Sequence, residues 1–387
     1  MATPSPNPSD LTPADDHGAW LRLALSPGLT HAQRLGLLQA LGPPGAWIDG
    51  GTAAIARLVG QPAALALARP DTPVCEAVEA ALRWRDQPGC HLLTLADPDY
   101  PKPLLDLADA PLLLYVRGHS LAAFRLPGLA IVGSRHATEA GKGIARSFAR
   151  SLAAHGLSII SGLAQGIDAA AHEGALAAEA GLTIAVMGTG IDRVYPAAHR
   201  DLAHRITDHG VLISELPLGA GPLRNHFPRR NRLIAALGIG VLVVEAARQS
   251  GSLITARQAG ETGREVFAVP GSIHSPVSRG CHQLIRQGAK LVESAEDVLE
   301  ELPSVGIQVR GGGAEGPPKE ATHLPTDTAR ELLETIGWSP VSVDSLLSST
   351  PLSHAQLAES LLELELSGLI EKLADGRLVR TGAGATP

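Results

Sequence analysis

The sequence predicts an α/β protein with a Rossmann-like, doubly wound parallel sheet, preceded by a small N-terminal helical domain and followed by a C-terminal winged-helix-like domain. Short apolar runs alternate with amphipathic stretches from residue 112 to residue 292, as strands do when helices join them. Gly-containing loops follow three of these runs, at 133–135, 161–168 and 188–196. Only helical patterns precede residue 90, and a second helical region follows residue 328.

The N-terminal region begins with a leader, residues 1–15, that is rich in Pro and Ser and is predicted to be disordered. The leader has no apolar segment of the kind found in signal peptides. Residues 16–88 are predicted to form a small helical domain of the SAM or helix-hairpin-helix type, with helices at 19–25, 30–41, 52–59, 62–68 and 73–85. The turn at 26–30 resembles one that can hold a DNA backbone, and a purely structural role is the alternative.

Residues 90–303 are predicted to form the Rossmann-like domain. Strands are expected at 112–116, 129–132, 157–160, 183–187, 211–214, 240–245, 265–269 and 290–292. Helices are expected at 138–155, 228–237, 250–263 and 281–287, together with an Ala-rich helix that ends near residue 180. Loops after parallel strands meet at the carboxyl edge of a sheet, where free backbone N–H groups and helix N-termini attract anions. This edge is therefore expected to bind phosphate.

Residues 304–327 contain two Gly-rich segments and are predicted to link the sheet to the winged-helix-like domain at 328–382. Three helices, at 328–337, 342–347 and 353–368, are expected before a β-hairpin. The third helix carries three Glu residues and no Lys or Arg, so packing or protein contact is favoured over DNA docking. Its burial is expected to involve Leu357, Leu361, Leu364 and Leu366.

The charges of the chain are distributed unevenly. The net charge is −7, yet residues 129–290 contain 17 Lys and Arg against 11 Asp and Glu, a net of +6. Residues 328–380 contain 4 against 8, a net of −4. A basic centre in an acidic chain suggests an anionic ligand for the centre.

The composition of the chain argues against a membrane protein and against a metal site. No apolar run approaches the length of about 20 residues that a bilayer span requires, so no membrane partner is predicted. The three Cys residues are scattered, which fits a reducing cytoplasm and argues against a thiolate zinc motif. The 15 His residues show no metal-ligand spacing. We therefore predict a cytoplasmic protein with no metal site and no cofactor.

The sharpest motif is the segment 225–232, in which Phe227 lies among Arg229, Arg230, Asn231 and Arg232 where a helix begins. Bases stack on aromatic rings while arginines hold phosphates, and stacking is worth about 1–3 kcal/mol per base. The other motifs are less specific. Gly133-Ser-Arg can be only a turn, Asp168 can cap a helix, and the Ser250–Thr255 hydroxyls can cap a helix or contact phosphate.

Several enzyme signatures are absent from the sequence. There is no Gly-x-x-x-x-Gly-Lys-Ser/Thr loop, and no catalytic Ser/His/Asp set or carboxylate pair stands out. Glu215 and Glu245 end two strands at the edge that carries the Gly-containing loops. These acids can serve acid–base chemistry or can pair with nearby arginines.

The central region closely resembles the DNA-processing protein A family (DprA, also called Smf). The resemblance rests on seven segments in the family's order: Ile-Val-Gly-Ser-Arg ending at 135, Ser-Gly-Leu-Ala-Gln-Gly-Ile-Asp at 161–168, Gly-Thr-Gly-Ile-Asp-Arg-Val-Tyr-Pro at 188–196, Phe-Pro-Arg-Arg-Asn-Arg at 227–232, Val-Glu-Ala from 244, Ser-Gly-Ser-Leu-Ile-Thr at 250–255 and Gly-Arg-Glu-Val-Phe-Ala-Val-Pro-Gly at 263–271. It implies a cytoplasmic, dimeric, non-catalytic protein. Such a protein binds and protects incoming or exposed single-stranded DNA and helps load the recombinase RecA, notably during natural transformation.

The resemblance also implies which residues bind DNA, and we combine it with the motifs above. The expected DNA-binding residues are Gly133, Ser134, Arg135, Gly162, Gln165, Gly166, Arg193, Tyr195, Arg200, Phe227, Arg229, Arg230, Asn231, Arg232, Ser250, Gly251, Ser252 and Thr255. Many relatives carry a basic residue directly after Tyr-Pro, where this chain has Ala197, and Arg200 can supply that charge. Leu284 and Ile285 are the expected dimer contacts, with burial in the core as the alternative.

A second hypothesis places the chain among enzymes. Nucleotide-cleaving phosphoribohydrolases use a similar Gly-rich doubly wound sheet and carry a Pro-Gly-Gly-x-Gly-Thr signature with catalytic Arg and Glu. The nearest equivalent here, Glu245 with the segment 250–255, departs from that signature. A plain nucleotide-binding module is the third hypothesis.

Overall fold

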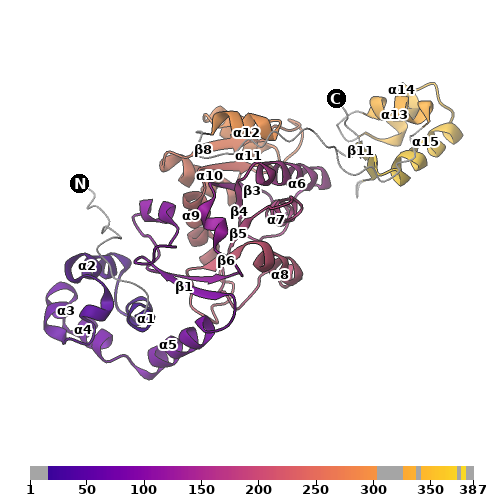
Figure 1. The fold of residues 1–387 in the computed structure, drawn as a ribbon. Coiled ribbons are helices and arrows are strands. Elements are labelled where there is room, and N and C mark those ends of the chain that lie inside the picture. Colours follow the sequence, from indigo (N-terminus) through magenta and orange to yellow (C-terminus); the bar gives the residue numbers. More distant parts are fainter. Residues whose placement is uncertain (1–15, 303–325, 337–340, 373–375, 381–387) are drawn as a thin grey trace. The chain divides into compact units, whose positions relative to one another are not determined.

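The computed structural model describes residues 16–302, 326–336, 341–372 and 376–380 (Figure 1). The chain forms two compact units, residues 1–308 and residues 309–387. The predicted N-terminal helices and the sheet belong to the first unit. The predicted leader and residues 304–325 of the predicted linker lie outside the described residues, and the last linker residue, Asp327, already belongs to a helix.

Five helices precede the sheet: α1 (His17–Leu25), α2 (His31–Leu41), α3 (Thr52–Val59), α4 (Gln61–Ala68) and α5 (Thr72–Arg85), with a 3₁₀ turn, η2 (Pro44–Ala46). Thr30 and Gln33 form a capping box that fixes the start of α2. Arg34 donates hydrogen bonds to the carbonyl oxygens of Leu23 and Ser26, at 2.9 and 2.8 Å, and so satisfies the end of α1. The guanidinium group of Arg34, which contacts the helix-hairpin-helix-like turn, is therefore already engaged by backbone oxygens of the protein.

The sheet of the first unit has nine strands in the order β1-β2-β6-β5-β4-β3-β7-β8-β9. The strands are β1 (Cys90–Thr94), β2 (Leu113–Arg117), β3 (Gly128–Val132), β4 (Ser158–Ser161), β5 (Thr183–Val186), β6 (Val211–Ser214), β7 (Gly240–Val243), β8 (Glu265–Ala268) and β9 (Lys290–Leu291). All pairs from β6 to β9 are parallel, which confirms the predicted α/β class. Strand β2 runs antiparallel to both β1 and β6, which was not predicted.

Helices cover both faces of the sheet, as a doubly wound fold requires (Figure 1). They are α6 (Glu139–Ala154), α7 (Ile167–Leu176), α8 (Arg200–His209), α9 (His226–Leu237), α10 (Ser252–Glu261), α11 (Arg279–Arg286) and α12 (Ala295–Glu301), with 3₁₀ turns η3 (Lys102–Asp106), η4 (Ala122–Arg125) and η5 (Ala197–His199). Helix α12 and strand β1 were not predicted.

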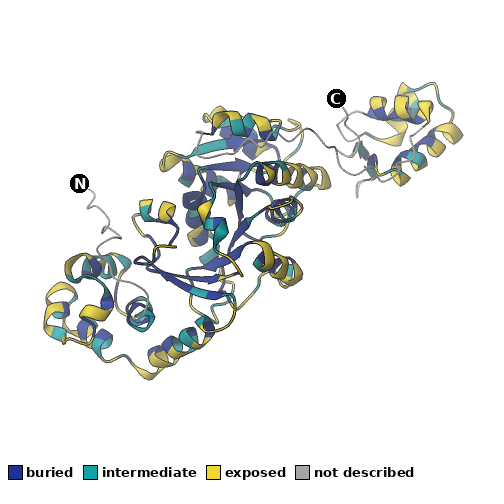
Figure 2. Cartoon of the chain, in the orientation of Figure 1, coloured by how far each residue is buried: buried dark blue, intermediate teal, exposed yellow. Residues whose placement is uncertain are grey.

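Strand β3 shows how one sequence serves both faces. Leu129 and Ile131 pack in the core beneath α6 and α7, whereas Ala130 and Val132 pack in the core beneath α9 and α10. Successive side chains of a strand point to opposite faces, so a strand buried on both sides needs a continuous apolar run. Figure 2 shows the central strands buried and the outer surfaces of the covering helices exposed.

The second unit has the predicted three helices and hairpin: α13 (Asp327–Ile336), α14 (Val343–Ser349), α15 (His354–Leu366), β10 (Ile370–Lys372) and β11 (Leu378–Arg380). Leu357 and Leu364 are buried in its core, and Leu361 packs against them. The expected burial of Leu366 is wrong, because this residue lies at the C-terminal end of α15 and is 81% exposed. Glu363 accepts hydrogen bonds from the backbone and hydroxyl of Thr326.

None of the described helices is long and apolar enough to cross a membrane.

Candidate functional site

A cavity of about 430 Å³ opens at the carboxyl ends of β3 and β7. The chain runs outward from β3 to β4, β5 and β6, and then returns to β7 on the other side of β3. The loops after β3 and β7 therefore diverge, which makes this the topological switch point where such sheets bind ligands. Many expected site residues line this switch-point cavity: Gly133, Ser134, Arg135, Arg230, Asn231, Ser250, Gly251, Ser252 and Thr255.

A smaller cavity of about 110 Å³ adjoins it, and the two share Arg135 and Ala164. The rings of Tyr195 and Phe227 line this aromatic cavity with their centroids 5.7 Å apart and their planes at 50°. The Arg135 Cζ atom lies 5.3 Å from the Phe227 centroid, in range for a cation–π contact. A β-carbon on Gly188 would lie 2.9 Å from the Phe227 ring, so glycine at 188 makes room for the ring. The cavity thus offers exposed π faces beside a cation.

Arg230 is placed differently from the expectation of an exposed phosphate ligand. It is only 4% exposed and forms part of the wall of the switch-point cavity. Its Nη1 atom donates to the carbonyl oxygens of Gly162, at 2.6 Å, and of Val186. Burial lowers the pKa of Arg230 to about 10, so the side chain stays charged at neutral pH. The structure therefore gives Arg230 a contact with the loop between β4 and α7.

The buried side chain of Asp168 also holds the loop between β4 and α7 in place. Its carboxylate accepts hydrogen bonds from the backbone N–H groups of Gly162 and Ala164, at 3.2 and 3.4 Å. Burial raises the pKa of Asp168, and the charge of Arg230 acts in the opposite direction. The alternative that Asp168 caps the next helix is not met, because Asp168 lies within α7 and its carboxylate binds N–H groups of the preceding loop. Gln165 lines the aromatic cavity from this loop, and Gly166 has a φ of +81°, a conformation that favours glycine.

Arg229 and Arg232 line neither cavity and converge instead on Glu215. Arg229 Nε lies 3.0 Å from Glu215 Oε1, and Arg232 Nη2 contacts Oε2. Arg232 also donates to the backbone oxygen of Asp109, at 3.1 Å, and is almost buried. Burial raises the pKa of Glu215, and the two arginines oppose that shift. Arg232 thus has the buried pairing that the sequence left open as its alternative.

The carboxylate of Glu245, the other candidate acid, is engaged in hydrogen bonds at the start of α6. Its two carboxylate oxygens accept hydrogen bonds from the backbone N–H and the hydroxyl of Thr138, at 2.9 and 2.7 Å, at the start of α6. Burial raises the pKa of Glu245, and these hydrogen bonds lower it. The carboxylate oxygens of both candidate acids are thus engaged by other residues of the protein. Among the described residues, no three His, Cys, Asp or Glu side chains gather to hold a metal ion.

The remaining expected residues lie outside the two cavities. Arg193 and Arg200 are exposed beside the loop that carries Tyr195, and Arg200 begins α8. Leu284 is buried in the core, and Ile285 packs against it. The sequence did not single out Ala164, Gly188 or Gln249 as cavity residues, because small and neutral side chains give no chemical signal by themselves.

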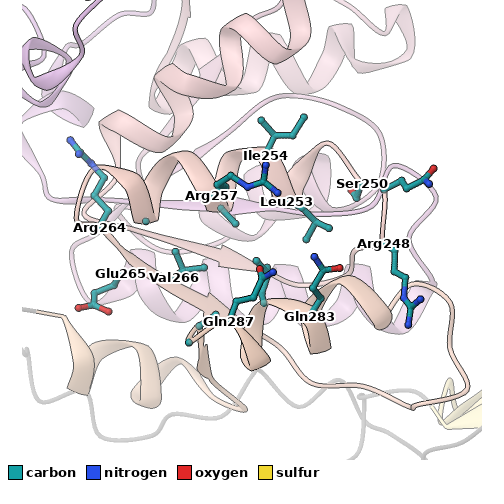
Figure 3. Close-up of a pocket in the computed structure, with 16 residues that line it drawn as sticks. Arg248, Ser250, Leu253, Ile254, Arg257, Arg264, Glu265, Val266, Gln283 and Gln287 are labelled. Carbon is teal, nitrogen blue, oxygen red and sulfur yellow. The ribbon is translucent and has the colours of Figure 1, made fainter.

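A third cavity, of about 500 Å³, lies in the groove between α10 and α11 (Figure 3). Leu253 and Arg257 of α10 face Gln283 of α11 and Gln287, which directly follows α11, across it. It is larger than the switch-point cavity, but Gly-containing loops from several strands do not converge on it. We therefore place the candidate site at the two cavities that share Arg135.

Family comparisons agree with this architecture. The family profile described as DNA recombination-mediator protein A matches residues 91–303, and the DprA winged helix domain profile matches residues 316–376. The chain is 42% identical over 308 residues to Protein Smf of Escherichia coli (strain K12), covering 78% of this chain and 80% of that protein. It is 48% identical over 209 residues to DNA processing protein DprA of Streptococcus pneumoniae, covering 54% and 73% of the two chains.

Solved structures give the same picture. DNA processing protein A from Streptococcus pneumoniae superposes with a TM-score of 0.65 and 39% identity, over 74% of this chain and 98% of that chain. DNA processing protein A from Helicobacter pylori, described for its unique single-stranded DNA binding mode, superposes with a TM-score of 0.50 and 29% identity, over 55% and 97%.

Proposed function

Because the chain belongs to the DNA recombination-mediator protein A family, we propose that it binds single-stranded DNA at the two cavities that share Arg135. The observation that carries this proposal is the cluster of Arg135, Tyr195 and Phe227 at the switch point. A base can stack on these rings while the neighbouring loops contact phosphate. In a duplex the base faces are already stacked, so the cluster favours single strands.

The phosphate contacts would come from the loops after β3 and β7. Arg135 is exposed and can reach a phosphate with two parallel N–H groups. Ser134, Ser250 and the start of α10 add hydroxyl and backbone donors at a helix N-terminus, where negative charge is favoured. Such contacts are independent of sequence, so the affinity should fall steeply with salt.

We further propose that the protein protects exposed or incoming single strands in the cytoplasm and helps deliver them to a RecA recombinase, notably in natural transformation. Support for this step comes from family membership, since a recombination mediator hands its strand to a recombinase. No reaction is part of the proposal, and no cofactor is required.

Homodimer formation is a separate proposal. Leu284 is buried within the protomer, so the contact would use the adjacent surface of α11 and β9. Ile285 is half-buried there, and Leu291 on the edge strand β9 is 50% exposed. An exposed edge strand with an apolar side chain is a common site of self-association.

A nucleotide-cleaving enzyme is the rival function. Such an enzyme needs a carboxylate facing the sugar, whereas Glu245 is engaged by Thr138 and Glu215 by two arginines. These contacts favour the binding function. Incubation with nucleoside monophosphates tests the rival, because release of free base would establish an enzyme.

The deciding experiment is a salt-dependent titration of the full chain with single- and double-stranded oligonucleotides. We expect tighter binding of the single strand, and a loss of about 1–3 kcal/mol in Phe227→Leu on both oligothymidylate and mixed strands. Phe148→Leu is the matched control, because Phe148 is a buried residue of α6 and its loss should lower stability alone. Equal affinity for duplex and single strand would contradict the proposal, and so would an unchanged single-strand affinity of the Phe227→Leu variant.

A further inference from the structure

The switch-point cavity contains more hydrogen-bond donors than the protein itself uses. Thr255 is only 1% exposed and lines the cavity, yet its hydroxyl makes no hydrogen bond within the described part of the chain. The Nε atom of Arg230, another buried residue of this cavity, has no hydrogen-bond partner there either. Buried donors are nearly always satisfied, because an unsatisfied one costs about 1–3 kcal/mol. A ligand with acceptor oxygens would supply a partner for donors that face this cavity.

The charges of the cavity point to an anion. Neither Arg135 nor Arg230 forms an ion pair with a carboxylate among the residues that the structure describes. Asp168 also lines this cavity, and its carboxylate accepts hydrogen bonds from the N–H groups of Gly162 and Ala164. The N-terminus of α10 adds partial positive charge at the same place. Two guanidinium groups thus remain without a direct counter-ion.

The donors reach the cavity from several directions. Ser134 follows β3, Arg230 belongs to α9, and Ser250, Ser252 and Thr255 follow β7. A phosphate diester inside a strand carries one charge and offers two free oxygens. A phosphate monoester carries about −1.5 to −2 at neutral pH and offers three acceptor oxygens. The higher charge of the monoester matches two arginines that have no direct counter-ion, and its three oxygens can accept hydrogen bonds from donors on several sides.

The aromatic cavity determines what is attached to that phosphate. It shares Arg135 with the switch-point cavity and presents the Tyr195 and Phe227 rings. One ligand with a phosphate in the first cavity and a base in the second would fill both. We propose that the switch-point cavity binds a terminal phosphate monoester, carried either by the end of a single strand or by a mononucleotide. This inference rests on the proposed function, because the same Arg135 serves the strand.

The test uses the full chain and oligothymidylates of about ten nucleotides, within the range of single-strand site sizes. Three forms are compared: 5′-phosphorylated, 3′-phosphorylated and hydroxyl at both ends. We expect one phosphorylated form to bind roughly tenfold more tightly, as one charge-assisted hydrogen bond would give. Competition with thymidine monophosphate and with thymidine separates the two sources, since competition by the monophosphate alone shows that a free nucleotide also fits.

Two variants assign the effect to the cavity. Thr255→Val removes the buried hydroxyl at nearly constant volume and should reduce the preference for the phosphorylated end severalfold. Thr262→Val is the matched control, because Thr262 lies at the opposite end of α10 and its hydroxyl bonds carbonyl oxygens of that helix. Ser134→Ala, at a half-buried position on another loop, should also reduce the preference and replaces Thr255→Val if that variant fails to fold.

The outcomes are distinct. Equal affinity for all three oligonucleotides would overturn the terminal-phosphate site and leave single-strand binding standing. Failure of every oligonucleotide to bind would overturn the proposed function itself. A preference for a phosphorylated end that both Thr255→Val and Ser134→Ala retain in full would place the phosphate elsewhere and also overturn the assignment.

Discussion

Arg230 lies directly against Gly162, with its Nη1 atom 2.6 Å from the Gly162 carbonyl oxygen and in the space that a β-carbon on Gly162 would occupy. The pair joins α9, which carries Phe227, to the loop that carries Gln165. A buried guanidinium held by carbonyl groups cannot shift without leaving donors unsatisfied. The two walls of the aromatic cavity are therefore positioned by one contact beneath them.

Gly162→Ala should destabilise the protein by about 1–3 kcal/mol, because the new methyl group must displace Arg230. Single-strand affinity should fall as well, since the cavity walls move. Gly143→Ala is the matched control. Gly143 is exposed within α6 with open space around it, so alanine there should stabilise the helix by about 0.5–1 kcal/mol. Thermal unfolding measures both variants, and equal stability of the two would contradict the contact.

Arg135→Ala should weaken single-strand binding by about 1.5–3 kcal/mol with little change in stability, because Arg135 is exposed. The slope of log affinity against log salt should also fall by about 1. Arg150→Ala, which removes an exposed arginine of α6, should change neither quantity appreciably. Fluorescence anisotropy at several salt concentrations is the measurement. An affinity equal to that of the Arg150→Ala protein would remove Arg135 from the site.

Arg232→Ala should act on stability first. It leaves the buried Glu215 with Arg229 as its remaining arginine, and breaking a buried pair from one side costs about 3–5 kcal/mol. Arg224→Ala, at an exposed position before α9, is the control and should unfold at the same temperature as the unmodified protein. If Arg232→Ala kept full stability and lost DNA affinity, Arg232 would belong among the DNA ligands.

Leu291→Arg should convert a dimer into a folded monomer, since it places a charge on the exposed part of the edge strand β9. Leu58→Arg, at a similarly exposed leucine of α3, should leave the mass unchanged. Leu284→Arg should unfold the protein, because Leu284 is buried in the core. Light scattering and circular dichroism report the two effects. A dimer that persists in Leu291→Arg would place the interface elsewhere.

Removal of residues 310–387 should leave single-strand affinity equal or slightly higher at low salt. Residues 328–380 carry a net charge of −4, and α15 has no Lys or Arg, so this unit repels phosphate weakly. The effect should vanish at high salt, where charges are screened. The same titration on full-length and truncated protein decides the matter. A tenfold loss, about 1.4 kcal/mol, would show that the second unit binds DNA.

The sequence predicted those parts of the fold and site that depend on local pattern. Continuous apolar runs such as residues 129–132 predict strands that are buried on both faces, because successive side chains of a strand point to opposite faces of the sheet. Strand β1 was missed because His91 interrupts its run, and its pairing with β2 depends on distant residues. The family resemblance was what placed Arg135 and Phe227 in one pocket. The burial of Arg230 could not be predicted, and the pairing of Arg232 was left only as an alternative, because the three arginines of the segment 225–232 look alike until the elements beneath them are placed.

The segment between β1 and β2 also bears on how the protein is made. It is fastened across α9 by Arg232, which reaches Asp109 over 123 residues, and by Arg264, which reaches Asp106 over 158 residues. A chain leaving the ribosome cannot close either contact until the later arginine has been synthesised, and domains generally fold as units during synthesis. The segment between β1 and β2 is thus fastened only late in translation, so a nascent or truncated chain that ends before residue 264 would lack the second of these contacts.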